Sequence, residues 1–267
     1  KVVDVLNAAF HWAIIRGELE FNPVAPIKPT LVKRIQKMWQ KSANEADVDV
    51  LSVEEQQAFE KEASLINPHN GEMKYAAGMY GLLLLHTGMR CGEMLALRWK
   101  DVDWKEGYLT IEKSRSMAKN RDNMDACNNK YVMVEGITKN EKARKIKLTE
   151  KALNILNLIK LHSPSNCDEE LIVKTRTGNP NTATNLEHRM VTIFSNAGLK
   201  DLSGGLHIFR RTFATRMYEK GARVKEIAAY IGDLESTTER YYIAVRKKVK
   251  EGNGVHQVVM VPGSDKG

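Results

Sequence analysis

The stretch AAGMYGLLLLHTGMRCGEMLALRW, residues 76–99, decides how this chain is expected to fold. Apolar residues fill its first half, and Thr87-Gly88 then interrupts them, so the pattern predicts a helix over about Met73–His86. The apolar residues that follow predict a second helix over Cys91–Trp99. Arg90 lies in the break between these two helices.

A cation at a junction between apolar helices is costly unless an anion or a carboxylate meets it. Glu93 lies three residues after Arg90, at the start of the second predicted helix, and is a candidate to orient the arginine. Two interpretations therefore remain open. Arg90 either forms a buried pair with Glu93 that serves the fold, or it is held ready for an anionic ligand.

The residues before these helices predict a separate N-terminal part. Apolar residues between Leu6 and Ile15 recur at helical spacing, and the pattern stops before Asn22-Pro23. In the basic segment that follows, three lysines spaced four residues apart share one helical face, namely Lys33, Lys37 and Lys41. This segment is either a solvated linker or a linker that lies on DNA phosphates.

The remaining patterns predict a mainly α fold with a small antiparallel β-sheet (α+β). Ser52-Val53-Glu54-Glu55 is a capping box that starts a helix. Strands are predicted over Tyr108–Ile111, Tyr131–Val134 and Lys145–Leu148, with a polar loop over Ser114–Lys130. Helices are predicted after Thr149 and over about Ala183–Asn196, Ile208–Glu219, Val224–Tyr230 and Ser236–Lys248.

Composition narrows the class of protein. In 267 residues, 41 Lys and Arg against 33 Asp and Glu give a net charge of +8, which favours a polyanionic partner. The longest mostly apolar stretch, Ala76–Leu85, is too short to span a bilayer, so no membrane segment is expected. Three scattered cysteines suggest neither disulfides nor a zinc ribbon, which fits a reducing, cytoplasmic compartment.

Several catalytic motifs are missing from the sequence. It contains no phosphate-binding P-loop, no Gly-x-Gly-x-x-Gly, no His-Glu-x-x-His and no Gly-x-Ser-x-Gly. A nucleotide-driven or zinc-dependent mechanism is therefore not expected, and no cofactor or metal is predicted. Because the chain opens Lys1-Val2-Val3-Asp4 without a methionine, we expect it to be a fragment of a longer protein.

Two further motifs carry candidate chemistry. His207-Ile208-Phe209-Arg210 places a histidine and an arginine three residues apart at a helix start, where both can donate to one phosphate. Ser236-Thr237-Thr238-Glu239-Arg240-Tyr241-Tyr242 combines a second capping box with two tyrosines. Taken alone, each motif is also compatible with ordinary packing.

The ordered set of motifs resembles the tyrosine recombinase (phage integrase) family over about Leu51–Val249. The set comprises an arginine in a glycine turn, a hairpin lysine, His-x-x-Arg and a late tyrosine, here Arg90, Lys139, His207, Arg210 and Tyr241. The resemblance implies the end of a core-binding domain (residues 1–26), a basic interdomain linker (27–50), a tyrosine recombinase catalytic domain (51–250) and a C-terminal tail (251–267).

The resemblance also implies a role for each residue. Tyr241 would attack a scissile DNA phosphate and form a 3′-phosphotyrosyl link, while Arg90 and Arg210 would stabilise charge on the non-bridging oxygens. Lys139 would protonate the leaving 5′-oxygen, with Lys142 or Lys145 as alternatives. His207 would hydrogen-bond the phosphate or assist proton movement, and Glu93 would orient its neighbours.

This chain departs from the family's pattern in two places. Asp233 follows Gly232 where the family usually has His or Trp. An aspartate there would repel phosphate unless it turned towards an arginine, and the alternative is that it faces outward. The segment from Gly232 to Ser236 is also one residue short. Counting from Asp233 selects Tyr242 as the nucleophile, whereas a helix cap at Ser236 selects Tyr241.

As a whole, the resemblance implies a site-specific recombinase that integrates or excises a phage or other mobile element in the cytoplasm of a bacterial host. Its expected partners are double-stranded DNA, a homotetramer of itself on paired DNA sites, and accessory DNA-bending proteins. The alternatives are a type IB topoisomerase-like enzyme and a non-catalytic DNA-binding relative of the same fold.

Overall fold

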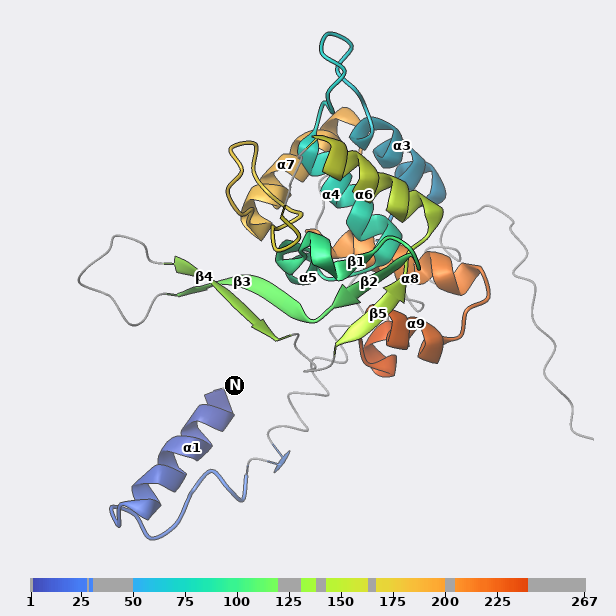
Figure 1. Cartoon of the computed structure of the whole chain (residues 1–267). Coiled ribbons are helices and arrows are strands. Elements are labelled where there is room, and N and C mark those ends of the chain that lie inside the picture. Colours follow the sequence, from blue (N-terminus) through green and yellow to red (C-terminus); the bar gives the residue numbers. More distant parts are fainter. Residues whose placement is uncertain are drawn as a thin grey trace, which may run out of the picture. The chain divides into compact units, whose positions relative to one another are not determined.

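The computed structural model describes residues 2–27, 29–30, 50–119, 131–137, 143–162, 167–199 and 205–239 (Figure 1). The chain divides into two units, Lys1–Asp47 and Val48–Gly267, and each is described here by itself. No helix in the described ranges is both long enough and apolar enough to cross a bilayer.

The first unit contains α1 (Val2–Ile15), which confirms the predicted N-terminal helix. Gly17, with a φ of 71°, follows the helix end. The Asn22 side chain then donates hydrogen bonds of 3.2 Å to the backbone and side-chain oxygens of Asn7. No residue of α1 is fully buried, and its apolar side chains are exposed or half-buried in the described part of this unit.

The second unit begins with α3 (Val53–Ala63), whose predicted capping box is confirmed. The Glu55 backbone N–H donates to Ser52 Oγ at 3.1 Å, and the Ser52 N–H donates to Glu55 Oε2 at 2.7 Å. Each group satisfies a donor that the first turn of a helix leaves unpaired. The start of α3 is therefore fixed by residues that are adjacent in the sequence.

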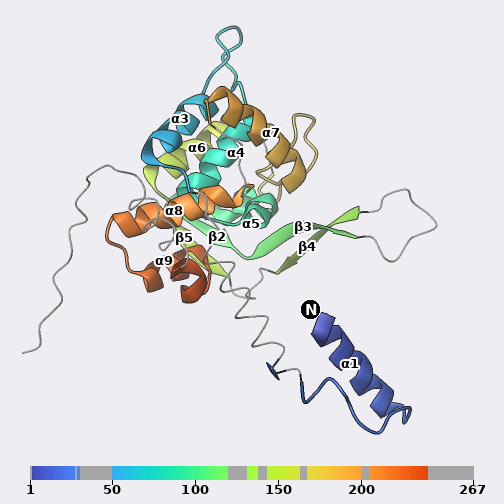
Figure 2. The ribbon, with the colours of Figure 1, turned by 180° about the vertical axis from the view of Figure 1, so that it is seen from behind.

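The central helix of this unit is α4 (Ala76–Thr87), which is buried on nearly every side. It packs against α3, α6 (Glu150–His162), α7 (Ala183–Asn196) and α8 (His207–Glu219), which surround it in Figures 1 and 2. The prediction placed its start at Met73, but Met73 instead forms a β-bridge with Ile66.

A second prediction, a helix over Cys91–Trp99, is wrong at its end. The helix α5 spans Cys91–Ala96 only, and a short 3-10 helix, η1, follows over Trp99–Asp101. Between them the Leu97 carbonyl accepts a hydrogen bond from the Ile172 N–H at 2.9 Å. Pairing with a distant extended segment therefore ends α5 earlier than its apolar pattern indicates.

A three-stranded antiparallel sheet has the strand order β1 (Val102–Asp103), β2 (Tyr108–Ile111) and β5 (Arg144–Lys147). Leu109 pairs with Ile146, and both side chains are buried in the core. This sheet and the surrounding helices confirm the predicted α+β class.

A two-stranded ribbon projects from the helical body, formed by β3 (Lys113–Lys119) and β4 (Tyr131–Ile137) (Figures 1 and 2). The prediction of a polar loop from Ser114 is therefore wrong as far as Lys119. Among the side chains of the ribbon that the structure describes, none is fully buried, and Met117 and Val134 are both 45% exposed. Without a buried face, a strand lacks the alternating pattern from which it can be predicted.

The C-terminal helices follow the prediction closely. Helix α7 has the predicted bounds, and α8 and α9 (Val224–Ile231) differ from theirs by one residue each. A further helical turn begins at Glu235 and is described as far as Glu239. Ser236 therefore lies inside this turn and does not cap it, which contradicts the predicted cap.

Candidate active site

A left-handed glycine turn positions Arg90 between α4 and α5. Gly88 ends α4 with a φ of 65°, and a Cβ added there would lie 2.3 Å from Cδ1 of Phe213 on α8. Only glycine satisfies both the backbone and the packing. The chain then reverses so that Arg90 precedes α5, and its backbone N–H donates to Glu93 Oε2 at 2.9 Å.

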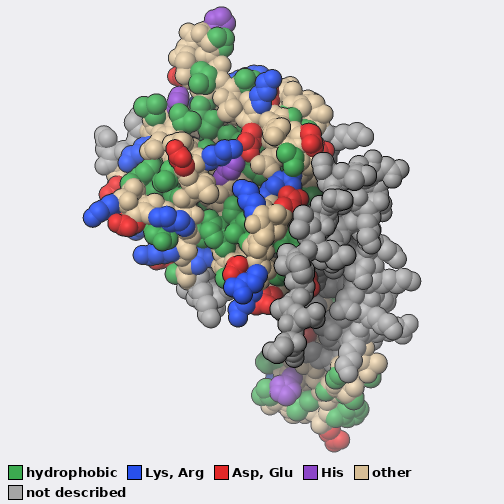
Figure 3. Space-filling view, turned by 90° about the vertical axis from the view of Figure 1, so that its right-hand side faces the viewer, with side chains coloured by type: hydrophobic (Ala, Val, Ile, Leu, Met, Phe, Trp, Pro, Cys, Tyr) green, Lys and Arg blue, Asp and Glu red, His purple; other side chains and the backbone are tan. Residues whose placement is uncertain are grey.

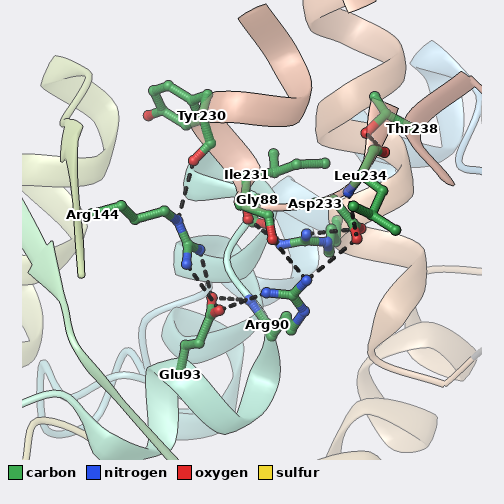
Figure 4. A network of polar contacts seen from close by, with 11 residues as sticks. Gly88, Arg90, Glu93, Arg144, Tyr230, Ile231, Asp233, Leu234 and Thr238 are labelled. Atoms are coloured by element: carbon green, nitrogen blue, oxygen red, sulfur yellow. Dashed lines mark hydrogen bonds and ion pairs between the residues drawn. The ribbon is translucent and has the colours of Figure 1, made fainter. Parts of the chain in front are cut away.

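Glu93 is a buried carboxylate, 1% exposed, between two guanidiniums (Figure 4). It accepts a hydrogen bond from Arg90 Nη1 at 2.9 Å and two from Arg144, at 3.0 Å from Nη1 and 2.6 Å from Nη2. Burial alone would raise the pKa of Glu93, but the hydrogen bonds and charges of Arg144 and Arg90 lower it. The carboxylate is therefore ionised and tightly held.

Arg210 is the most deeply buried cation of the site, at 2% exposed. Its Nη1 donates to the carbonyl of Gly88 at 2.8 Å and to that of Ile231 at 2.9 Å. Its Nη2 pairs with Asp233 Oδ2 at 3.0 Å. Burial, followed by the positive charge of Arg90, lowers the pKa of Arg210.

Asp233 joins the two arginines on which the candidate chemistry depends. One carboxylate oxygen lies 3.4 Å from Arg90 Nη2, and the other lies 3.0 Å from Arg210 Nη2. The Leu234 N–H also donates to this carboxylate, at 3.2 Å. The possibility that Asp233 faces outward is wrong: it turns inward because two guanidiniums attract it.

His207 begins α8, one turn before Arg210. Partial desolvation lowers its pKa, as do the charges of Arg211, Arg210 and Arg90, while Asp233 opposes the shift. The ring is thus neutral at pH 7, which leaves one nitrogen as an acceptor and the other as a donor.

Of the three candidate lysines of the hairpin, the structure describes only Lys145. Lys139 and Lys142 lie outside the described residues. Lys145 is exposed on β5, and alternation along a strand places it on the opposite face from Arg144, which reaches Glu93. This orientation disfavours Lys145 as the general acid.

The candidate nucleophiles Tyr241 and Tyr242 also lie outside the described residues. The cap at Ser236 that favoured Tyr241 is absent, so that argument no longer separates them. Another tyrosine close to the site, Tyr230, is committed to structure. Its hydroxyl donates to the Lys147 carbonyl at 2.8 Å, and burial raises its pKa to about 12.

Sequence analysis missed Arg144 as a member of this site. Its Nε donates to the Tyr230 carbonyl at 3.3 Å, so this side chain links β5, α9 and α5 (Figure 4). The sequence held only a weak signal, because Arg144 shares the inward face of β5 with buried Ile146 and is polar.

The assembled site is suited to bind an anion. Three guanidiniums against two carboxylates leave an excess of positive charge, and their donors are fixed by surrounding carbonyls. On the face of the molecule in Figure 3, by contrast, Lys and Arg side chains are interspersed with Asp and Glu. Within the described ranges, no group of three or more His, Cys, Asp or Glu side chains is placed to hold a metal ion.

Comparison with known proteins extends these observations. The phage integrase family model matches residues 56–248. A tyrosine recombinase XerC-like protein of Caldanaerobacter subterraneus subsp. tengcongensis is 25% identical over 262 residues, covering 92% of this chain and 62% of that protein. The integrase of Staphylococcus phage L54a is 28% identical over 171 residues, covering 61% of this chain and 46% of that protein. The chain therefore spans less than two thirds of either relative.

Solved structures share the fold. The Tn1549 transposon integrase in complex with transposon right end DNA has a TM-score of 0.62 and 17% identity, with coverage of 93% of this chain and 77% of that chain. A lambda integrase dimer bound to a core site has a TM-score of 0.56 and 18% identity, with coverage of 97% and 76% respectively.

Proposed function

This chain belongs to the phage integrase family, and we propose that it is a site-specific DNA recombinase acting through a 3′-phosphotyrosyl intermediate. The observation that carries the proposal is the meeting of Arg90 and Arg210 at one carboxylate, with His207 beside them. Residues 90 and 210 come from opposite halves of the chain. Two guanidiniums fixed side by side can each donate hydrogen bonds to a non-bridging oxygen of a phosphodiester.

In the proposed reaction, the phenolic oxygen of Tyr241, with Tyr242 as the alternative nucleophile, attacks the phosphorus of one DNA phosphodiester. The bond to the 5′-oxygen breaks, and that oxygen takes a proton from Lys139 and leaves as a 5′-hydroxyl. The phenolic proton passes to a nearby base. One ester bond forms as another breaks, so the later attack by a 5′-hydroxyl of the partner strand needs no external energy source.

The described residues support this chemistry in distinct ways. Arg90 and Arg210 stabilise the charge that develops on the two non-bridging oxygens. His207, with its neutral ring, accepts or relays a proton next to them. Glu93 and Arg144 touch no reacting atom in this scheme, and they hold Arg90 in place.

The wider role is proposed from the relatives. We propose double-stranded DNA as the substrate, a homotetramer on paired sites with accessory DNA-bending proteins as the assembly, and integration or excision of a mobile element in a bacterial cytoplasm as the outcome. One observation favours a second candidate, a non-catalytic DNA-binding protein of the same fold. Asp233 stands where the family usually has His or Trp, and it already occupies both arginines.

A covalent-adduct assay tests the proposal. The protein is incubated with a duplex that spans the ends of the mobile element flanking its gene, and the products are separated under denaturing conditions. We expect a protein–DNA adduct that Tyr241→Phe abolishes and Tyr242→Phe retains, or the reverse if Tyr242 is the nucleophile. Tyr108→Phe is the matched control, because Tyr108 is on β2 and exposed.

The outcomes separate the candidates. Loss of the adduct in Tyr242→Phe alone would move the nucleophile by one residue and keep the reaction. Retention of DNA binding with no adduct in the unaltered protein would refute the recombinase and favour the non-catalytic candidate.

A further inference from the structure

Asp233 occupies the position at which two arginines converge, and nothing in the proposed reaction uses it. Its two carboxylate oxygens each meet a different guanidinium, Arg90 at 3.4 Å and Arg210 at 3.0 Å. A carboxylate and a phosphodiester both offer two anionic oxygens to such a pair. The carboxylate thus takes the place that a DNA phosphate would take.

We propose that Asp233 is the resident counter-ion of this anion site, that it offsets part of the positive charge of the two arginines while no DNA is bound, and that the substrate phosphate displaces it. This inference rests on the proposed function, because it identifies the competing anion as a DNA phosphate. In this role, Asp233 lowers the affinity of the site for phosphate, because an incoming phosphate must displace it.

The burial of Arg210 explains why a counter-ion is needed. Its guanidinium is almost wholly removed from water, and its other two partners are the neutral carbonyls of Gly88 and Ile231. A buried cation without a counter-charge is strongly destabilising. Asp233 supplies the only carboxylate with which Arg210 forms an ion pair within the described residues.

The arginines do not depend on Asp233 for their positions. Arg210 is held by the two carbonyls on its Nη1, and Arg90 is held by Glu93 and by the carbonyl of Gly232, which accepts from its Nη2 at 2.8 Å. If the carboxylate leaves, both guanidiniums retain these contacts. The site is therefore preserved for an incoming phosphate.

Asp233 is also placed to leave. Its side chain is 16% exposed, against 2% for Arg210, so the carboxylate lies on the side of the pair nearer to solvent. Its backbone N–H is fixed to the Ala228 carbonyl at 2.9 Å. Rotation of the side chain alone removes the carboxylate from both arginines without unfolding α9.

Thermal unfolding of the full chain in inorganic phosphate tests this role. Asp233→Asn is compared with the unaltered protein in phosphate and in chloride at matched ionic strength. We expect the variant to have a lower melting temperature in chloride, because Arg210 loses its counter-ion. We also expect it to bind phosphate with a roughly tenfold lower apparent Kd, a difference of about 1.4 kcal/mol.

Three further variants make the result specific. Glu226→Gln removes the same charge from the exposed surface of α9, and it reports the general effect of phosphate on stability. Asp233→Glu keeps the charge and should respond to phosphate as the unaltered protein does. Asp233→Ser keeps an acceptor for the Leu234 N–H, and it replaces the Asn variant if that variant does not fold.

A purely structural Asp233 would lower stability equally in both salts. A phosphate response of the Asn or Ser variant that is equal to or smaller than that of the unaltered protein would therefore overturn the inference. The experiment needs no cleavage. Failure of the adduct assay would refute the recombinase, whereas failure of the phosphate titration would refute only the role of Asp233.

Discussion

Replacement of Glu93 by alanine tests the electrostatic design of the site most directly. The carboxylate accepts four hydrogen bonds, two from Arg90 and two from Arg144, and it is 1% exposed. Glu93→Ala leaves two guanidiniums close together in a largely buried space without the charge that held them.

The size of the loss follows from this burial. Removal of one partner of a buried ion pair costs about 3–5 kcal/mol, because the other partner is left uncompensated. For a domain of this size, each kcal/mol lowers the melting temperature by roughly 2–4 °C, so we expect a fall of about 6–20 °C. Arg90 is 20% exposed and Arg144 is 13% exposed, so water partly solvates the guanidiniums that Glu93→Ala leaves unpaired. This partial solvation favours the lower half of that range.

Thermal and urea unfolding followed by circular dichroism measure this loss. The chain contains a matched control in Arg223-x-x-Glu226, which has the same geometry at the start of α9 but is exposed to solvent. Glu226→Ala should lower stability far less than Glu93→Ala.

A double-mutant cycle isolates the pair. In Glu93→Ala/Arg144→Ala the second change removes one of the stranded charges, so the combined loss should be smaller than the sum of the two single losses by at least about 1 kcal/mol. Strict additivity, or a loss below about 1 kcal/mol in Glu93→Ala itself, would refute the reasoning that this carboxylate holds the site together.

Three other predictions concern the same region. Folding lowers the pKa of Glu93, so the stability that its carboxylate contributes is fully present above the usual pKa of 4.5 and is lost as the pH falls through the pKa of the folded state. Between about pH 6 and pH 3, the urea midpoint should therefore drop less in Glu93→Gln than in the unaltered protein. The pKa of His207 is lowered from 6.5, so the rate of adduct formation should fall only below that pH, and His207→Gln should remove this inflection in a pH–rate profile. Gly88→Ala should destabilise the protein by at least about 2 kcal/mol in urea unfolding, since it adds a left-handed backbone penalty to a clash with Phe213; a loss within error would show that the turn tolerates a side chain.

The sequence by itself determined the elements whose signals are local. The capping box at Ser52, the glycine that ends α4 and the start of α5 behind Arg90 are fixed by residues within a few positions of one another. Helical periodicity likewise gave the bounds of α7. The sequence also predicted that Arg90 must meet a carboxylate or an anion. This prediction needs no knowledge of the partner, because burying an unpaired charge is costly whatever the partner is.

Tertiary structure alone decided the features that depend on distant partners. The end of α5 is set by Ile172, since a backbone hydrogen bond to a remote segment outweighs a local preference. The strand β3 exists through its pairing with β4, and no buried face marks it in the sequence. The inward turn of Asp233 and the place of Arg144 beside Glu93 arise in the same way, because only the folded chain brings these charges close enough for their attraction to exceed the cost of removing them from water.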